Sequence, residues 1–462
     1  MYEIMKKFEF TGETKTINLL FGTATLHRIR AVAKFGFVEI GELGGWIEKE
    51  ENLSHEENAW VYGDAKVYGN AKVYGNAEVR DKAEVCGNAI VYGNAKVGEN
   101  AKVQDKAEVC GNAIVYGNAK VGEDAEVYDN AEVCGNVIVF GNAKVRGKAE
   151  VCGNAIVCDN AKVGENAEVY GKALIYGDAK VYGNAKVYGN AKVGEDAEVY
   201  DKAEVYDKAE VYGNAQIYGN AIVRANAKVY GKAEVCGKAG VCGKAEIRDD
   251  AKVYDKAIVC EDANVYGKAQ IYGDAKVWYD AKVYGNAEVC GKAEVRGKAE
   301  IRDDANVYGN ANVYGNAKIY GNAKVYDNAK VWEDAIVCSN VKVYGNAIVC
   351  GNAKVYGNAK VYGNAEVCGK AEVCGKAEVF STRHVLVIGT IGSQDDFATF
   401  YRDKDNEITV KCGYFLDKID KFLEKVTETH GDSNYALVCR AAVEAARLQI
   451  DLSNEVTKDA DE

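Results

Sequence analysis

A six-residue repeat runs through most of the chain and constrains its fold more than any other feature. From Val61 to Val379 every sixth residue is Val or Ile, so 53 hexapeptides follow one another without an insertion or a deletion. Up to Val373, the fourth residue after each anchor is Ala, except that Val137 and Val341 replace it. Such repeats have to be recognised before domains are counted, because each one packs only against its neighbours.

The repeat unit predicts a short strand followed by a corner. A period of six matches neither the 3.6-residue turn of a helix nor a heptad. In the typical unit A-K-V-Y-G-N, the first four residues alternate between small or aliphatic side chains and polar or aromatic ones, as a strand does. Gly and Asn tolerate the positive φ of a tight turn, whereas corners such as Asp81-Lys82 fit it less well.

Corners that always turn the same way coil the chain. Three corners of about 120° close a triangle, so one coil takes three hexapeptides, and the coils stack about 4.8 Å apart like strands of a parallel sheet. The repeats then make about 18 coils and a rod of roughly 85 Å. The sequence therefore predicts an all-β solenoid, a parallel β-helix with 18 residues per triangular coil, over residues 61–380.

Composition and charge exclude several classes of protein. Hydrophobic residues make up 48% of the chain and charged residues 28%, which is ordinary for a folded protein. The formal net charge of −12 is spread over alternating acids and bases, and no basic run tracks a nucleic acid backbone. No apolar run is long enough to span a membrane, and the start lacks the apolar core of a secretory signal. We therefore expect a cytoplasmic protein.

The repeat resembles a known family. An aliphatic residue followed four places later by a small one is similar to the hexapeptide repeat of left-handed parallel β-helices, and the left hand is implied by that resemblance. The pieces "GGWI" at residues 44–47, "NLS" at 52–54 and "WV" at 60–61 resemble the start of the YdcK-like β-solenoid proteins, which are often labelled acyltransferases. The resemblance covers roughly residues 25–380 and implies a transferase-like fold of bacterial origin.

The residues do not support acyltransferase chemistry. The hexapeptide-repeat acyltransferases that this chain resembles use a histidine base, loops that leave the helix and a pocket between subunits. All four histidines, His27, His55, His384 and His430, lie outside the repeats, and the unbroken period leaves no room for a loop. The Val and Ala interior is too tightly filled for a ligand. We predict no catalytic residue, no metal site and no cofactor, and an acyltransferase relative remains the alternative.

One face of the predicted solenoid carries a ladder of tyrosines. Residues eighteen apart should stack, and twelve of the eighteen positions that follow the anchors on this face are Tyr. Tyr is common at interfaces, but it is also a strand-former that covers the backbone. The twelve residues of this candidate interaction stripe are Tyr74, Tyr92, Tyr128, Tyr182, Tyr200, Tyr218, Tyr254, Tyr272, Tyr308, Tyr326, Tyr344 and Tyr362.

Thirteen of the fifteen cysteines occupy the same position after an anchor. Three pairs are eighteen residues apart and should be neighbours: Cys134 and Cys152, Cys242 and Cys260, and Cys350 and Cys368. Their Cα atoms should fall within disulfide range, but parallel side chains hold the Cβ atoms slightly too far apart. We expect free thiols in a reducing compartment, and two thiolates without a histidine make a poor zinc site.

Both ends depart from the repeat, as capping units do. Residues 1–60 are predicted to form a β-rich cap, with strands at Lys7–Phe10 and Ile29–Val38, a turn at Thr11-Gly12, and Trp46 and Trp60 covering the first coil. Residues 381–462 are predicted to form a separate α+β domain, whose acidic end, Thr457–Glu462, frays. Its segments "IGTIGSQDDFATFYR" and "VKCGYF" resemble an uncharacterised domain of bacterial and prophage proteins.

Within this domain, strands are expected at His384–Ile388, Phe397–Tyr401 and Glu407–Cys412. A helix should follow that places Phe415, Ile419, Phe422, Leu423 and Val426 on one face and ends at Gly431. A second, Ala-rich helix is predicted from Asn434 to Leu452.

The C-terminal domain also holds the one candidate ligand site. Gly392 and Ser393 could offer N–H groups to an anion beside Arg402 and Lys411. The hypothesis that we favour is a non-enzymatic rigid rod, a structural protein that spaces or presents its terminal domain. We expect a protein partner or self-association as a homo-oligomer, and neither nucleic acid nor membrane. The alternative is a ligand-binding or catalytic C-terminal domain on a passive stalk.

Overall fold

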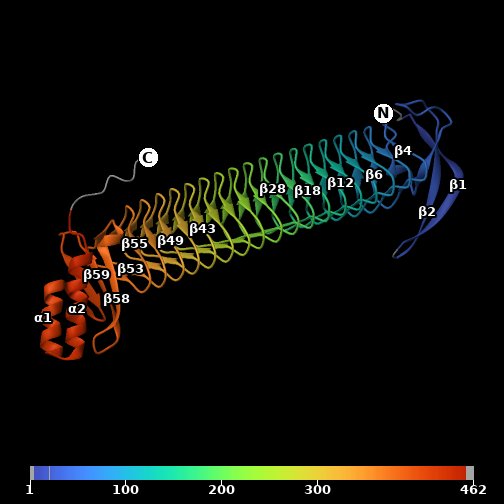
Figure 1. Ribbon diagram of the computed structural model, residues 1–462. Coiled ribbons are helices and arrows are strands. Elements are labelled where there is room, and N and C mark those ends of the chain that lie inside the picture. The colour runs from blue at the N-terminus through green and yellow to red at the C-terminus, as the bar shows by residue number, and fades with distance from the viewer. Residues whose placement is uncertain (1–4, 20, 454–462) are drawn as a thin grey trace. The chain divides into compact units, whose positions relative to one another are not determined.

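The computed structural model describes residues 5–19 and 21–453 and divides into two compact units, residues 1–232 and 233–462 (Figure 1). Each unit contains a parallel β-solenoid, and the C-terminal part of the second unit adds four antiparallel strands and two helices. The predicted acidic end, Thr457–Glu462, lies outside the described residues. The all-β solenoid and the small α+β domain are confirmed.

The solenoid of the first unit consists of two-residue strands that begin every six residues, from β4 (Trp60–Val61) to β32 (Lys228–Val229). From β4 to β29 (Glu210–Val211), each strand pairs in parallel with the strand three places later. Thus Val67 of β5 (Lys66–Val67) lies beside Val85 of β8 (Glu84–Val85). The N–H of Lys66 donates to the carbonyl of Ala83 at 2.9 Å, and the N–H of Tyr68 to that of Val85 at 3.0 Å. This confirms the predicted register of eighteen residues.

The solenoid of the second unit repeats the same arrangement from β33 (Glu234–Val235) to β57 (Glu378–Val379). Here too β54 (Lys360–Val361) pairs in parallel with β57, which places Val361 beside Val379. In both units the anchors and the Ala residues that follow them have no exposed surface, or almost none. The axis of each solenoid is therefore filled by Val, Ile and Ala, as the sequence predicts.

The corners carry a feature that the sequence did not reveal. The first residue of each corner has positive φ, whether it is Gly or an acid such as Asp249 (φ 61°). The Asp249 carboxylate accepts a hydrogen bond at 3.1 Å from the N–H of Gly267, the equivalent residue of the next coil. The N–H of Gly267 has no partner in the strand ladder. The carboxylate supplies one, and this hydrogen bond offsets the strain of the positive φ at the acidic corner.

Removing such a carboxylate should destabilise the solenoid measurably. For Asp249→Ala we expect the free energy of unfolding in urea to fall by about 1–2 kcal/mol, because an acceptor is lost and Ala is poor at positive φ. Asp249→Asn is the control, since Asn keeps an acceptor oxygen and tolerates this conformation. Equal losses for the two variants would show that the carboxylate bond contributes nothing.

The N-terminal cap is built on a long hairpin of β1 (Phe8–Leu19) and β2 (Gly22–Ala31), followed by β3 (Leu43–Ile47) and a short 3-10 helix, η1 (Glu50–Asn52). The prediction of a turn at Thr11-Gly12 is wrong: β1 continues through this pair, and its register shifts between Phe10 and Thr14 at a bulge. The prediction of a strand from Ile29 to Val38 is also wrong, because β2 ends at Ala31.

The first turn of the solenoid begins inside the predicted cap. Ile47 pairs in parallel with Val67, and Leu53 forms a parallel bridge with Val73. Trp60 has no exposed surface; it occupies the outward position beside Glu78, and its ring packs edge-on against Phe8 of the cap at 6.3 Å. Trp46 lies at the outward position beside Lys66 and packs against Ala24 and Leu26 of β2. That these tryptophans cover the first coil therefore stays a prediction.

The C-terminal domain consists of the strands β58 (Val385–Ile391), β59 (Asp396–Arg402), β60 (Ile408–Cys412) and β61 (Phe415–Lys418), and the helices α1 (Ile419–His430) and α2 (Asn434–Gln449). The strands expected at Phe397–Tyr401 and Glu407–Cys412 are present as β59 and β60, which pair antiparallel. Phe415 was wrongly predicted to lie on the first helix; it is in β61 and pairs with Cys412. Both helices pack on the sheet, where Phe400, Val410 and Phe422 share one core.

This domain is joined to the last coil of the second unit through β59. The N–H of Glu372 donates to the hydroxyl of Thr399 at 2.9 Å, and Ala377 forms a bridge with Asp403. Tyr401 has no exposed surface, and its hydroxyl lies 3.3 Å from the sulfur of Cys374 in the last coil. The strand therefore caps the open edge of the solenoid and fixes the domain to it.

His384 lies at the same junction and should make it sensitive to acid. Burial, with a contribution from Arg402, lowers the pKa of His384 from 6.5 to about 4, and its Nδ1 accepts from the N–H of Phe380 at 3.2 Å. Between pH 4 and 6.5, His384 is protonated in the unfolded chain but neutral in the folded one. The free energy of unfolding therefore rises with pH over this range and is lost as the pH falls through it.

We expect this loss to be roughly 2–3 kcal/mol for the C-terminal domain, measured by urea unfolding at several pH values. His384→Asn keeps an acceptor but cannot titrate, so its stability should depend less on pH. His430→Asn, a change at the other end of the domain, should keep the wild-type profile. A profile that His384→Asn leaves unchanged would contradict the assignment.

Candidate interaction surfaces

The tyrosines of the predicted stripe stack in both units. In the first unit, the rings of Tyr182 and Tyr200 lie 5.1 Å apart and within 3° of parallel. In the second unit, Tyr326 and Tyr344 lie 4.9 Å apart and within 2°. Tyr74 is the one stripe member classed as exposed, at 39%, and the others are half-buried. The coil register stacks these residues in separate runs, and Tyr128 stands alone between Cys110 and Arg146. Their role as an interaction surface stays a prediction.

Tyrosine stacking is not confined to that stripe. Tyr170, Tyr188 and Tyr206 stack on another face of the first unit, with rings 4.9 and 4.7 Å apart. Tyr hydroxyls also donate to carboxylates of the next coil, as from Tyr188 to Glu204 at 3.3 Å. Burial, followed by the charge of Glu204, raises the pKa of the Tyr188 hydroxyl well above its usual value. Tyrosines thus bind successive coils to each other on more than one face.

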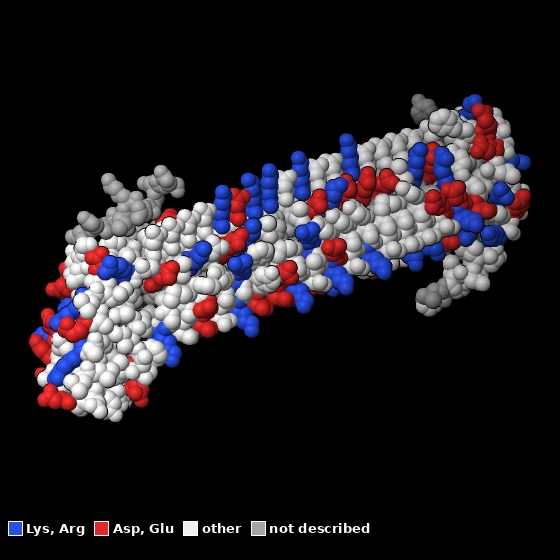
Figure 2. All heavy atoms as spheres, viewed as in Figure 1, with Lys and Arg blue, Asp and Glu red and all other residues white. Residues whose placement is uncertain are grey.

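Lysines and glutamates form rows beside the anchors. Lys180 and Glu198 pair at 2.6 Å in the first unit, and Lys354 and Glu372 at 3.0 Å in the second. Figure 2 shows positive and negative side chains interleaved on the visible face rather than gathered into a patch of one sign. Because exposed ion pairs contribute little stability, we interpret these rows mainly as a solvated, charge-balanced surface.

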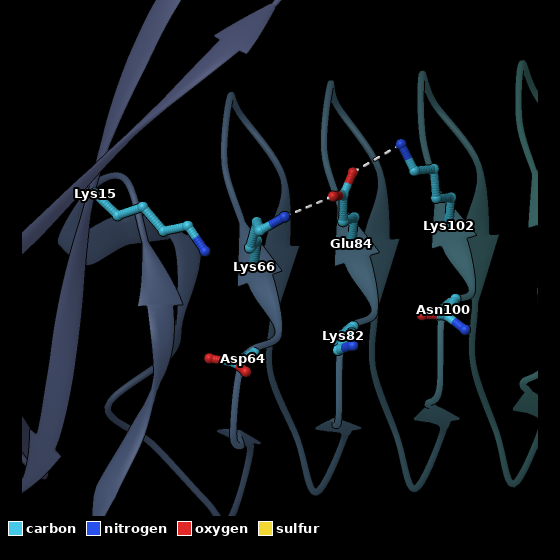
Figure 3. Close-up of a pocket in the computed structure, with 7 residues that line it drawn as sticks. All are labelled: Lys15, Asp64, Lys66, Lys82, Glu84, Asn100 and Lys102. Atoms are coloured by element: carbon cyan, nitrogen blue, oxygen red, sulfur yellow. Dashed lines mark hydrogen bonds and ion pairs between the residues drawn. The ribbon is translucent and has the colours of Figure 1, made fainter.

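A hollow of about 350 Å³ lies beside the N-terminal hairpin (Figure 3). In its centre Glu84 pairs with Lys66 and Lys102, each at 2.8 Å, and these lysines hold the pKa of Glu84 below its usual value against the opposing effect of burial. The charged side chains that line the hollow therefore largely neutralise one another. The lining residues are Lys15, Asp64, Lys66, Lys82, Glu84, Asn100 and Lys102.

The four residues of the predicted anion site do not meet. Gly392 and Ser393 lie between β58 and β59, just before β59 begins. Arg402 is the last residue of β59 and therefore lies at its other end. Arg402 is 3% exposed, and its guanidinium lies 4.6 Å from the ring centre of Phe380. Lys411 lies 3.6 Å from the carboxylate of Glu372. Both basic side chains therefore serve the junction between coil and domain.

Helix α2 has two apolar faces, and sequence reasoning missed the second. One face packs on the sheet through residues such as Cys439 and Val443. The other is exposed and follows the spacing i, i+4, i+8, i+11. Leu437 is 54% exposed and Leu448 is 82% exposed. We call the exposed residues the α2 stripe; they are Leu437, Ala441, Ala445 and Leu448.

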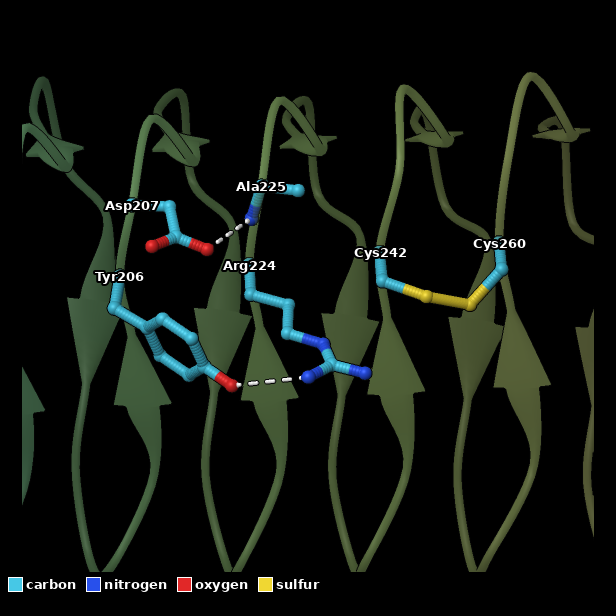
Figure 4. Close-up of a disulfide and its surroundings, with 6 residues drawn as sticks. All are labelled: Tyr206, Asp207, Arg224, Ala225, Cys242 and Cys260. Carbon is cyan, nitrogen blue, oxygen red and sulfur yellow. Dashed lines mark hydrogen bonds between the residues drawn. A yellow bond between two sulfur atoms is a disulfide. The ribbon is translucent and has the colours of Figure 1, made fainter.

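The three cysteine pairs are disulfides, which contradicts the prediction of free thiols for these six residues. The Cα atoms of Cys134 and Cys152 lie 4.7 Å apart, and those of Cys242 and Cys260 lie 4.6 Å apart. The remaining pair joins Cys350 to Cys368. Figure 4 shows the Cys242–Cys260 bond crossing between neighbouring coils. The sulfur atoms turn toward each other, so the parallel side chains that we expected to prevent bonding do not prevent it.

The histidines lie at the ends of the solenoids or beyond them. His55 sits in the cap, where its Nδ1 accepts from the N–H of Lys7 at 3.2 Å and its ring stacks on Phe8. His384 holds the C-terminal junction, and His430 ends α1. Within the described part of the chain, no helix is both long and apolar enough to cross a bilayer.

The register, the capped ends and the filled axis together define a parallel β-solenoid built from six-residue repeats. A family model described as the YdcK Beta solenoid repeat matches residues 215–231. This match covers about one coil, and the solenoid fold agrees with it. No curated protein matches its sequence.

Proposed function

We propose that the protein is a non-enzymatic scaffold whose solenoid carries the C-terminal domain and presents the α2 stripe to a second copy of the chain. The observation that carries this proposal is the combination of a fixed domain with an uncovered apolar helix face. Leu437 and Leu448 expose about half or more of their surface although the same helix packs fully on its other side. Exposed apolar stripes of this kind are typical of protein contact sites.

The attachment of the domain supports the scaffold part of the proposal. The contacts of Thr399 with Glu372 and of Tyr401 with Cys374 join the domain to the last coil without a flexible linker. The Val and Ala axis leaves no space for a substrate within the described coils. A stiff support that holds an interaction surface in a fixed orientation needs no chemistry of its own.

The charges and small residues of α2 favour a second copy as the occupant. Ala441 and Ala445, in the middle of the stripe, allow close approach of two helices. If two α2 helices pair antiparallel about a dyad near residue 442, Arg440 comes opposite Glu444 of the second copy, and the reverse pair forms at the same time. In the single chain Arg440 pairs with Asp432 at 3.2 Å and Glu444 pairs with Arg447 at 2.9 Å, so both side chains exchange partners when this register forms.

Light scattering on the full chain tests the proposal. We expect a dimer that dissociates on dilution, and a monomer for Leu437→Glu, because the carboxylate would be buried in the contact. Leu416→Glu is the matched control, since Leu416 is 46% exposed on β61 and lies outside the stripe. The dimer should also weaken in Arg440→Glu and recover when Glu444→Arg is added.

A monomeric mass at every concentration, or equal effects of Leu437→Glu and Leu416→Glu, would contradict the proposal. A dimer that Arg440→Glu leaves unchanged would contradict the antiparallel register.

A further inference from the structure

One of the three disulfides has a carboxylate beside it. The sulfur atoms of Cys134 and Cys152 and a carboxylate oxygen of Glu132 all lie within 4.8 Å of one another. Cys134 and Glu132 flank the anchor Val133, so both project outward from one strand, and Cys152 projects from the equivalent position of the next coil. Among the described residues this is the one group of three potential metal ligands from His, Cys, Asp and Glu.

The Glu132 carboxylate is held in place by a neighbour. The hydroxyl of Tyr116, one coil earlier, donates to its Oε1 at 2.5 Å. Carboxylates that bind metals are usually oriented by a second hydrogen bond of this kind.

The distances suit a divalent ion of intermediate softness. In a tetrahedral zinc site, bonds of about 2.3 Å to sulfur and about 2.1 Å to oxygen place neighbouring ligand atoms roughly 3.5–3.8 Å apart. Two thiolates on stacked coils and one carboxylate can reach this spacing by rotation of their side chains, because the Cα atoms of the cysteines are 4.7 Å apart. A fourth position is left for water.

The other two pairs serve as internal comparisons. Cys242 and Cys260 are flanked at the corresponding positions by Gly240 and Ile258, which offer no ligand. Cys350 and Cys368 are flanked by Ile348 and Glu366, but only the first pair has a carboxylate oxygen within 4.8 Å of both sulfur atoms among the described residues. The closeness of the Glu132 carboxylate therefore distinguishes the first pair from the other two.

We propose that Cys134, Cys152 and Glu132 form a redox-gated site for a zinc-like divalent cation. In the oxidised protein the disulfide joins the two coils and offers no thiolate. A dithiol reductant transfers two electrons and two protons to the disulfide, which yields two thiols and the oxidised reductant. The cation then displaces both thiol protons and binds the two thiolates and the Glu132 carboxylate.

Cobalt titration of the full chain, with Co²⁺ alone as the probe, tests this site. After reduction and removal of the reductant without oxygen, we expect one tightly bound Co²⁺ per chain with the intense absorption of tetrahedral thiolate coordination, and Zn²⁺ should displace it. The oxidised chain should show no such absorption. Glu132→Gln should weaken binding, and Tyr116→Phe, which removes the orienting bond, should weaken it by about 10- to 100-fold.

Two double variants complete the test. Cys134→Ser with Cys152→Ser should abolish tight binding, while Cys242→Ser with Cys260→Ser should leave it unchanged. Glu132→Gln retains the disulfide, so its result stays decisive even where loss of the cysteines harms folding. Equal binding by wild type and Glu132→Gln, or equal losses in the two double variants, would overturn the proposal.

Discussion

Replacing Val103 by Asp should lower the free energy of unfolding by more than about 4 kcal/mol, the largest effect that we expect from a single substitution in the repeats. Val103 has no exposed surface and lies between Val85 and Val121 of the adjoining coils. A carboxylate there would be buried without a partner, among aliphatic groups on every side. Urea unfolding followed by circular dichroism measures the change.

The neighbouring residue provides the control. Gln104 follows Val103 directly but is partly exposed on the outer surface. Gln104→Asp loses an exposed hydrogen bond of 3.1 Å to the Asp105 carboxylate but leaves its own charge in water, so it should cost no more than about 1 kcal/mol. If the two Asp variants were equally stable, the axis at this coil would have to be open to water rather than filled.

Tyr401→Ala should release the C-terminal domain from the solenoid of the second unit, at a loss of about 3–5 kcal/mol. The Tyr401 ring is fully buried at the junction, and its hydroxyl contacts Cys374. Hydrogen exchange measured by mass spectrometry should show faster exchange in residues 366–380, which the domain covers in the intact protein.

Tyr414→Ala is the matched control, because this tyrosine of the same domain is fully exposed. We expect wild-type exchange and stability from it. Unchanged exchange at residues 366–380 in Tyr401→Ala would mean that Tyr401 does not hold the junction, and it would weaken the case for a fixed domain.

The register of the coils could be predicted from the sequence because one rule is repeated without interruption. Each anchor and the Ala four places later must be buried, which a coil made of whole hexapeptides allows. Corners of about 120° then set three hexapeptides, or eighteen residues, for each coil.

The prediction of where the solenoid begins failed because the spacing of the anchors changes near the N-terminus. Ile47 and Leu53 are six residues apart and occupy anchor positions, but eight residues separate Leu53 from Val61, so the first turn escaped a search for strict periodicity. The bulge in β1 could not be read from Thr11-Gly12, because Gly is compatible with either a turn or a bulge.

Candidate sites were harder to predict because they depend on side-chain direction. Arg402 and Ser393 are close in sequence, yet β59 carries them to opposite ends of a strand. The second apolar face of α2 was visible in the spacing of Leu437, Ala441, Ala445 and Leu448, but its Ala residues also suited a buried helix. The carboxylate beside Cys134 becomes apparent only when stacked coils are considered together.

Mapping of disulfides by mass spectrometry in the oxidised full-length protein tests the central claim, the stacking of residues eighteen places apart, most directly. We expect the bonds Cys134–Cys152, Cys242–Cys260 and Cys350–Cys368, each of which joins two neighbouring coils. Cysteines six residues apart, such as Cys152 and Cys158 or Cys368 and Cys374, lie on different sides of a coil and should not be joined. Bonds between those near neighbours, in place of the three predicted ones, would contradict the coil register on which every other conclusion depends.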